Sequence, residues 1–204
     1  MNVRKKQKRE QILEATYDIF VEKGYANTKI IDIANRSGIG KGTVYEYFDS
    51  KEAIFMALFD YFSNEYKKNY EYIKKSNENK KASEQLRIFI KYDTSIVHYV
   101  CHTKKLPPHL FLLELFRDAK LSTLFEKFIE YRYHCLLNII KNGISSGEFK
   151  EGDPSMYSIG ILGSIAFYID FQNQHFIPQV LKDISVKNWN SNDLLSLILN
   201  GLQK

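Results

Sequence analysis

Apolar residues recur every three or four positions over most of this chain, which is the pattern of amphipathic α-helices. The first such stretch extends over about Lys6–Lys23 and ends before Gly24, a residue suited to the position after a helix. Two shorter stretches follow within Thr28–Phe48. No segment shows the strict alternation of apolar and polar residues that is typical of a strand. The pattern therefore predicts an all-α protein.

A long helix is expected from the capping-box pair Asp49 and Glu52 to about Lys74, followed by a polar loop over residues 76–81. Further helices are predicted over about 82–103, 109–117, 121–144, 154–174 and 192–202, the fourth of them announced by Asp153 and Pro154. We expect about nine helices in two parts. Residues 1–50 form an N-terminal three-helix domain, and residues 51–204 form a larger helical domain.

The two short stretches have the form of a helix-turn-helix. The apolar residues that recur from Ile30 at i, i+3 and i+4 give the first helix one apolar face, and Thr28 stands at its expected N-cap. Gly38 tolerates positive φ, so the chain can turn sharply and bury Ile39 before the second helix begins. This arrangement is typical of DNA-binding proteins.

The second short helix places different chemistry on different sides. Val44 and Phe48 form an i, i+4 apolar pair that we assign to the local core, whereas Tyr45 fits core packing and outward contact equally well. Gly40 and Gly42 flank Lys41 at its first turn. Small residues let the backbone approach a surface closely, and a cation there suits a phosphate.

Charge supports an anionic partner for the N-terminal domain. The net charge is only +5, but residues 1–51 hold ten Lys or Arg against seven Asp or Glu. Five of these cations fall within the first nine residues: Arg4, Lys5, Lys6, Lys8 and Arg9. A short basic run is often a solvated terminus, but beside a helix-turn-helix it favours phosphate contact. The lysine pairs at 67/68, 74/75 and 80/81 fit a solvated helix face better than a second DNA surface.

These residues resemble the N-terminal signature of the tetracycline-repressor (TetR) family of bacterial transcription regulators over about residues 9–60. The resemblance is carried by Gly24-Tyr25, Thr28, Ile33-Ala34, Ser37-Gly38-Ile39, Gly42, Tyr45, Phe48 and Lys51-Glu52. It implies a homodimer that binds a palindromic DNA operator and is released when a small molecule enters the C-terminal domain. No GxSxG, GxxxxGK[ST] or HExxH motif is present, so we expect neither an enzyme nor a cofactor.

The resemblance also implies the DNA-contacting residues. The expected set, with two cations of the basic arm, is Thr28, Lys41, Gly42, Thr43, Tyr45, Tyr47, Lys51, Lys6 and Arg9. Lysine can donate to guanine, and hydroxyl groups can meet phosphate oxygens. The sequence departs from the family pattern at Gly40, where a capping serine is common, at Tyr47, where histidine is common, and at Lys29, where a second threonine is common.

A dimer interface is expected on the helix after Asp153, where small residues lie among apolar ones on nearly every side. The expected contacts, with those of the last helix, are Gly160, Gly163, Phe167, Leu195 and Ile198. A tightly packed position inside one chain is the alternative for this patch. In such a homodimer each chain would contribute two helices to a four-helix interface.

The effector is expected to be lipophilic or aromatic, because 16 of the 29 aromatic residues fall between Phe55 and Tyr133. The candidate lining residues are Phe62, Tyr66, Phe89, Tyr92, Tyr99, Phe111, Phe116 and Phe167. Plain core packing is the alternative for each of them. The sequence leaves the effector, the operator and the choice between repression and activation open.

Metal binding by His98, Cys101, His102 and His109 is a further hypothesis: His98 and His102 share a helical face at i, i+4 spacing, and Cys101 lies one residue from that face. No carboxylate completes a metal motif, so no metal is expected, but the sequence leaves metal binding by His98, Cys101 and His102 open. Cys101 and Cys135 fit reduced, packed thiols, and neither a signal peptide nor a membrane span is visible. These features indicate a cytoplasmic, nucleoid-associated bacterial protein with no membrane partner. A helical architectural or protein-interaction module without an effector is the alternative function; it would show little sequence preference on DNA.

Overall fold

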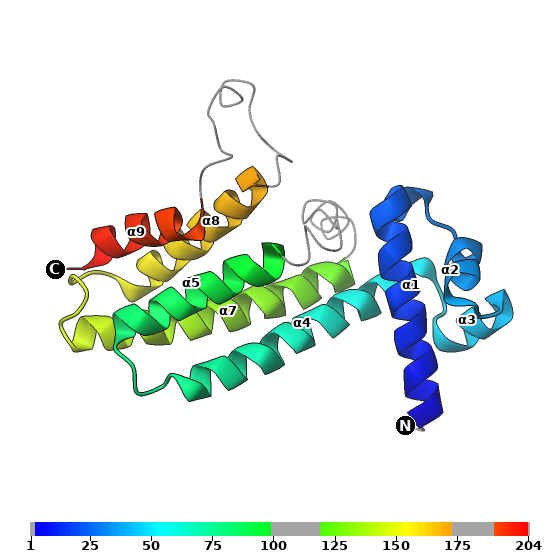
Figure 1. The fold of residues 1–204 in the computed structure, drawn as a ribbon, viewed down its shortest axis with the longest axis horizontal. Helices are drawn as coiled ribbons and strands as arrows, with labels where there is room; N and C mark the ends of the chain where they lie inside the picture. The colour runs from blue at the N-terminus through cyan, green and yellow to red at the C-terminus, as the bar shows by residue number, and fades with distance from the viewer. Residues whose placement is uncertain (1–2, 99–118, 173–189, 204) are drawn as a thin grey trace, which may run out of the picture.

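The computed structural model describes residues 3–98, 119–172 and 190–203 of the 204-residue chain (Figure 1). Within these ranges the chain forms eight α-helices and no strand, which confirms the all-α prediction. The helices are α1 (Val3–Asn27), α2 (Ile30–Ser37), α3 (Lys41–Tyr47), α4 (Lys51–Ser76), α5 (Ala82–His98), α7 (Ala119–Ser145), α8 (Pro154–Gln172) and α9 (Ser191–Leu202). None of these helices is long and apolar enough to cross a bilayer. Figure 1 shows α1, α2 and α3 at one end of an elongated molecule and α5, α7, α8 and α9 at the other.

The N-terminal end is organised around one apolar core. Its buried members are Ile12, Leu13, Tyr17, Phe20, Ile33, Ala34, Val44, Phe48, Ile54, Phe55 and Leu58. Two glycines take the positive φ that the chain needs to change direction. Gly24 interrupts α1 with a φ of 75°, and Gly38 ends α2 with a φ of 66°. Both positions agree with the sequence prediction, because only glycine adopts this conformation without a steric cost.

The predicted cap of α2 is wrong by one residue. The N-cap is Lys29, whose backbone N–H donates to Oδ2 of Asp32 at 3.0 Å. Thr28 is buried, and its hydroxyl donates to the carbonyl oxygen of Gly24 at 2.7 Å. The threonine hydroxyl thus closes the end of α1 instead of opening α2. Such i to i−4 bonds to the backbone compete with capping for Thr and Ser side chains.

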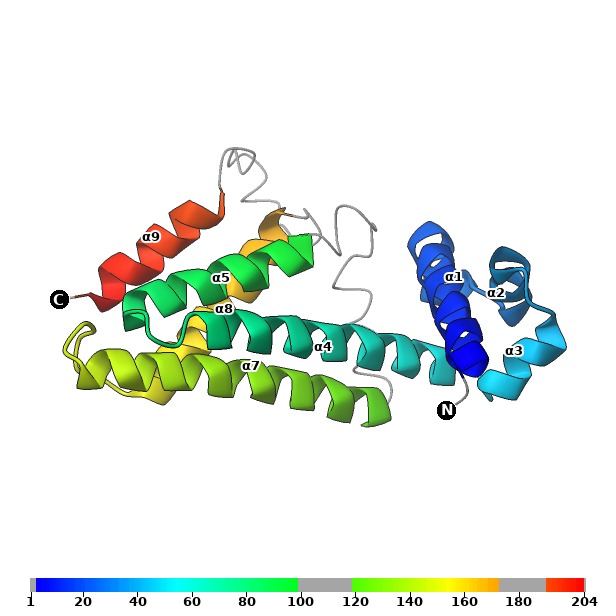
Figure 2. The same cartoon turned by 60° about the horizontal axis from the view of Figure 1, so that its bottom comes forward.

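Helix α4 joins the two ends of the molecule (Figure 2). Its 26 residues span about 39 Å at about 1.5 Å per residue. The N-cap is Ser50, whose Oγ accepts from the backbone N–H three residues on at 3.1 Å, so the prediction of Asp49 is wrong by one position. The first half of α4, as far as Leu58, packs into the N-terminal core, and Tyr66 and Tyr70 of the second half pack into the core of the bundle.

The bundle core is built mainly from α5, α7, α8 and α9. Asp153 caps α8 as predicted, since its Oδ1 accepts from two backbone N–H groups of the first turn at 2.7 and 3.0 Å. Glu148, in the turn after α7, accepts from the backbone N–H groups of Ala82 and Ser83 at 3.0 and 3.1 Å. A carboxylate thus binds the N-terminus of α5, where the free N–H groups favour negative charge. These contacts fix the end of the bundle that lies farthest from α1.

Candidate nucleic-acid interface

The two sides of α3 differ in burial. Val44 is fully buried and Phe48 is 5% exposed, so both pack into the N-terminal core as predicted. Tyr47 and Thr43 are half-buried, and the ring of Tyr47 packs against the same core. Tyr45 is 46% exposed, which resolves the two readings of its pattern in favour of an outward position. Core packing of Val44 and Phe48 therefore fixes α3, and the outward side of the helix presents polar groups.

The first turn of α3 is open to its surroundings. Lys41 and Gly42 are both exposed, and the amino group of Lys41 has no hydrogen-bond or ion-pair partner among the residues that the structure describes. A Cβ atom built on Gly42 would meet nothing within 4 Å. A free cation thus lies beside a stretch of bare backbone, a combination that suits close approach to a polyanion.

Two residues of the expected DNA-contacting set are engaged within the chain. Thr28 is 2% exposed, and its hydroxyl donates to the carbonyl oxygen of Gly24 near the end of α1. The Nζ of Lys51 donates to the carbonyl oxygen of Tyr25 at 2.8 Å and lies 4.2 Å from the centroid of the Tyr25 ring. The hydroxyl of Tyr25 in turn donates to Oε1 of Glu52 at 3.0 Å. These contacts join the end of α1 to the first turn of α4.

The carboxylate of Glu52 is stabilised in its charged form. Its own backbone N–H and the hydroxyl of Ser50 donate to it and lower its pKa most strongly. Burial opposes them to a smaller extent, and the hydroxyl of Tyr25 and the charge of Lys51 add weaker lowering effects. Glu52 therefore stays ionised at neutral pH at the N-terminus of α4, where negative charge is favourable.

The basic arm is the beginning of α1, which is helical from Val3 onward, and lies beside α3 (Figure 2). The guanidinium of Arg9 lies 5.2 Å from the centroid of the Phe48 ring, directly after α3. The side chain of Lys6 is 66% exposed and faces Glu10 at 3.8 Å. Such an exposed pair is weak, so Lys6 remains accessible. The arm adds positive charge beside α3.

The expected effector-binding aromatics lie in different environments. Phe62 packs against the N-terminal core, whereas Tyr66 and Phe89 are buried in the bundle core and Tyr92 packs against it. Phe167 is 59% exposed on α8. Tyr99, Phe111 and Phe116 lie outside the described residues, as do Cys101, His102 and His109 of the metal hypothesis. The part of the chain that the structure describes holds no cluster of three or more metal-ligating side chains.

A buried ion pair joins α5 to α7, and none of the expectations from sequence includes it. Asp93 is 1% exposed and Arg132 is 9% exposed. The Nε of Arg132 donates to Oδ1 of Asp93 at 2.9 Å, and its Nη2 contacts the other carboxylate oxygen. The hydroxyl of Tyr66 donates to the same Oδ1 at 2.7 Å. The sequence did carry a signal, because Asp93 falls four residues after Phe89 on the apolar stripe of α5.

Arg132 and Tyr66 keep the protonation states that their bonds to Asp93 require. Burial alone would lower the pKa of Arg132, but the charge of Asp93 and the hydrogen bonds to it raise that pKa on balance. Burial, together with the neighbouring charge of Asp93, raises the pKa of Tyr66 well above its ordinary value. Arg132 is therefore cationic and Tyr66 is a neutral donor throughout the physiological range.

The outer side of α8 and α9 is apolar and hollowed. A groove of about 860 Å³ is lined by Gly160, Gly163, Ser164, Phe167, Tyr168, Phe171, Asp193, Leu194 and Leu197. Of the expected dimer contacts, Gly160, Gly163 and Phe167 therefore lie on this surface. Leu195 and Ile198 instead face the chain's own core, at 0% and 8% exposure, and Leu197, at 71%, takes the outward position on α9.

Comparisons with known proteins agree with this architecture. A family model described as bacterial regulatory proteins of the tetR family matches residues 12–58. A fatty acid metabolism regulator protein of Bacillus subtilis (strain 168) is 30% identical over 155 residues, which cover 72% of this chain and 74% of that protein.

Solved structures are similar over nearly the whole chain. The transcriptional regulator FadR from Bacillus subtilis, crystallised in complex with stearoyl-CoA, superposes with a TM-score of 0.68 at 25% identity and covers 94% of this chain and 98% of that one. A TetR transcription regulator from Haloarcula marismortui superposes with a TM-score of 0.79 at 19% identity, over 98% of this chain and 100% of that one. The second likeness concerns the fold alone.

Proposed function

The chain belongs to the tetR family of bacterial regulatory proteins, and on that premise we propose that it is a repressor that binds a palindromic DNA operator as a homodimer and is released by a long-chain acyl-CoA. The observation that carries the proposal is the division of α3 into a buried side, at Val44, and an exposed polar side, at Lys41 and Tyr45. Such a protein acts on DNA in the bacterial cytoplasm.

Sequence reading would depend on the exposed side of α3. Lys41 can donate to O6 or N7 of guanine, and Tyr45 can meet a thymine methyl group with its ring or a phosphate with its hydroxyl. Gly42 would let the backbone approach the groove, and Thr43 and Tyr47 would donate to phosphates beside it. Lys6 and Arg9 would add phosphate contacts, which makes binding steeply salt-dependent.

Thr28 and Lys51 act differently in this proposal. Their side-chain donors already serve the carbonyl oxygens of Gly24 and Tyr25. We assign them the task of holding α1, α2 and α4 in the geometry that presents α3, with any phosphate contact of Lys51 limited to its remaining donor capacity.

Dimerisation is supported by the exposed apolar residues of the outer side of α8 and α9. Met156, Ile159, Phe167 and Leu197 are 69%, 60%, 59% and 71% exposed, and Gly160 and Gly163 between them permit close helix contact. Isolated exposed apolar residues are common, but Phe167 and Leu197 line one groove together with Gly160 and Gly163, and an apolar patch of this kind is typical of an interface. A two-fold axis here would present two copies of α3, as a palindrome requires.

The effector class is supported by the similar proteins and by the composition of the larger domain. One relative is a fatty acid metabolism regulator, and the similar FadR structure contains stearoyl-CoA. The aromatic residues between Phe55 and Tyr133 fit a ligand with a long apolar chain. Release would follow if the acyl-CoA favours a conformation in which α4 has moved and the two copies of α3 no longer match the operator.

Operator selection tests the DNA-binding half of the proposal. Purified protein is incubated with random duplexes, and the bound sequences are recovered and sequenced. We expect one palindromic motif, bound tightly by the wild type and weakened about 10- to 100-fold by Lys41→Ala, the loss expected for one good base contact. Salt-dependent binding without any preferred sequence would instead favour an architectural module.

A further inference from the structure

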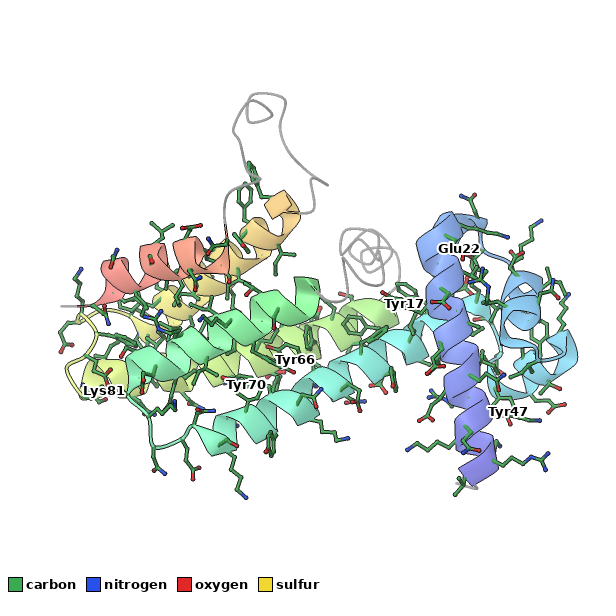
Figure 3. All side chains as sticks on the ribbon, viewed as in Figure 1. Tyr17, Glu22, Tyr47, Tyr66, Tyr70 and Lys81 are labelled. Carbon is green, nitrogen blue, oxygen red and sulfur yellow. The ribbon has the colours of Figure 1, made fainter. Side chains whose placement is uncertain are left out.

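Three helices meet at the carboxylate of Asp93. Tyr66 comes from α4, Asp93 from α5 and Arg132 from α7, and the donors of Tyr66 and Arg132 lie 2.7 and 2.9 Å from the same oxygen. Figure 3 labels Tyr66 and Tyr70 where α4 meets the bundle. Neither the DNA-facing residues nor the dimer surface includes any member of this set, which we name the Asp93 network.

Stability alone does not account for a buried ion pair of this kind. Replacing such a pair by apolar residues of similar volume is often neutral or stabilising, because both charges lose their hydration on burial. Hydrogen bonds, however, are directional and act over a narrow range of distance. The Asp93 network therefore forms in one register of α4 against α5 and α7, whereas ring packing tolerates small displacements.

Further bonds act on the same part of α4. The hydroxyl of Tyr92 on α5 donates to the carbonyl oxygen of Tyr66 at 2.9 Å. The hydroxyl of Tyr131 on α7 donates to Oε1 of Glu71 at 2.8 Å. Helices α5 and α7 thus both hold α4 by polar contacts, and these contacts fall within about one and a half turns of α4.

Tyr66 occupies a special place along α4. Residues before it, as far as Leu58, belong to the buried core of the N-terminal unit, and Tyr66 is the first residue of α4 that is buried in the core of the bundle. A displacement of the N-terminal unit that is carried along α4 first meets the ring contacts of Phe59 with Phe125 and Phe128 of α7, and then the hydrogen bond of Tyr66 to Asp93. Breaking its bond to Asp93 would leave a buried acceptor partly unsatisfied, so intermediate positions of α4 are disfavoured.

We propose that Tyr66 is a positioning residue, and that its hydrogen bond to the Asp93–Arg132 pair fixes the register of α4 and thereby the position of the helix-turn-helix relative to the bundle. The proposal deepens the regulation described under the proposed function, since it names the contact through which a change in the bundle reaches the DNA-binding unit. The positioning role of Tyr66 does not depend on which effector moves α4.

The test measures the distance between the two ends of the chain directly. Spin labels are attached through unnatural amino acids at Asn35 on α2 and Lys141 on α7, both exposed, so the cysteines stay intact. The labelled chain is mixed with an excess of unlabelled chain, so that a dimer holds one labelled copy.

Tyr66→Phe removes only the hydroxyl, and Tyr70→Phe is the matched control. Tyr70 is also buried, one turn further along α4, and its hydroxyl has no hydrogen bond among the described residues.

We expect Tyr66→Phe to shift or broaden the distance distribution by about 3 Å or more, the rise of two helical residues, while Tyr70→Phe superposes on the wild type. Tyr92→Phe, which loses the bond to the Tyr66 carbonyl, is a second variant in case Tyr66→Phe does not fold, and should move the distribution in the same way. Wild-type distributions for the folded tyrosine variants would overturn the proposal.

A further arm separates this proposal from the proposed function. Stearoyl-CoA is added to the labelled wild-type protein without DNA. If the distribution responds to Tyr66→Phe but not to stearoyl-CoA, the positioning role stands and the proposed effector is wrong. If it responds to stearoyl-CoA but not to the folded tyrosine variants, the effector stands and the register is fixed elsewhere.

Discussion

The amino group of Lys51 lies 2.8 Å from the carbonyl oxygen of Tyr25 and 4.2 Å from the centre of its aromatic ring. One lysine at the start of α4 thus holds the last turn of α1 through a charge-assisted hydrogen bond and a cation–π contact. The contact explains how a residue of the DNA-binding signature can be required without reading DNA.

Lys51→Met should destabilise the protein by about 1–3 kcal/mol, because the apolar stem is kept while the bond to Tyr25 is lost. Lys41→Met is the matched control. Its amino group has no partner in the described residues, so its free energy of unfolding should stay within about 0.5 kcal/mol of the wild type. Denaturant titration followed by circular dichroism checks both. Equal stabilities of the two variants would show that the Tyr25 contact contributes nothing.

Gly42 and Gly38 should respond to alanine in opposite ways. Gly42→Ala places a methyl group in open space on a helix and should stabilise the protein by about 0.5–1 kcal/mol. Gly38→Ala forces a φ of 66° on alanine and should destabilise it by about 1–2 kcal/mol. If the backbone at Gly42 approaches DNA, its more stable alanine variant should nevertheless bind the selected operator more weakly. Unchanged operator affinity, measured by fluorescence anisotropy, would remove Gly42 from the interface.

Much of the fold follows from local signals. Gly38 and Asp153 occupy the predicted positions because a left-handed turn and a helix N-terminus each demand particular residue types. The orientation of α9 could not be predicted in the same way. Leu194, Leu195 and Leu197 are equally apolar, and only packing against the rest of the chain decides that Leu195 is buried and Leu197 exposed.

The Asp93 network shows a second limit of the sequence. A charged residue on an apolar helix stripe indicates a buried partner, but the partner lies 39 residues away on α7. Long-range pairing of this kind depends on how the helices are arranged. The position of the DNA-binding helix, in contrast, follows from a short pattern whose parts are neighbours in the chain.

Leu197→Asp should prevent dimerisation without unfolding the chain, because the side chain is 71% exposed in the monomer. Leu195→Asp places a charge at a fully buried position two residues away and should unfold the bundle. Light scattering after size-exclusion chromatography gives the mass of each variant, and circular dichroism gives its helix content. A dimeric Leu197→Asp protein would show that α9 lies outside the interface.

Stability should fall in acid partly through Glu148. Burial opposes ionisation of this carboxylate, but the N–H and hydroxyl of Ser83, the N–H of Ala82 and the hydroxyl of Ser146 donate to it, so its pKa lies below the ordinary value of 4.5. Because the pKa of Glu148 is lower in the folded state, its charge stabilises the folded state at pH values above the ordinary pKa. That contribution is lost as the pH falls through the lowered pKa.

Glu148→Gln should therefore cost about 1 kcal/mol at pH 7, as for a lost helix cap, and progressively less below about pH 4.5. Glu151→Gln, at an exposed glutamate three residues on, should leave the free energy of unfolding unchanged. Thermal unfolding of both variants and the wild type is measured between pH 3 and 7, at steps of about half a pH unit, and gives the difference in stability at each pH. A difference from wild type that does not vary with pH would mean that the charge of Glu148 is irrelevant to the cap.

Titration of stearoyl-CoA into the complex of wild-type protein with its selected operator tests the central claim most directly. Fluorescence anisotropy of the labelled operator reports release, and free CoA and stearate serve as controls below micelle-forming concentrations. We predict that stearoyl-CoA weakens operator binding by about tenfold or more, within the usual range of coupling between two sites, and that neither control does so. An operator that stays bound with unchanged affinity at saturating stearoyl-CoA would contradict regulation by acyl-CoA.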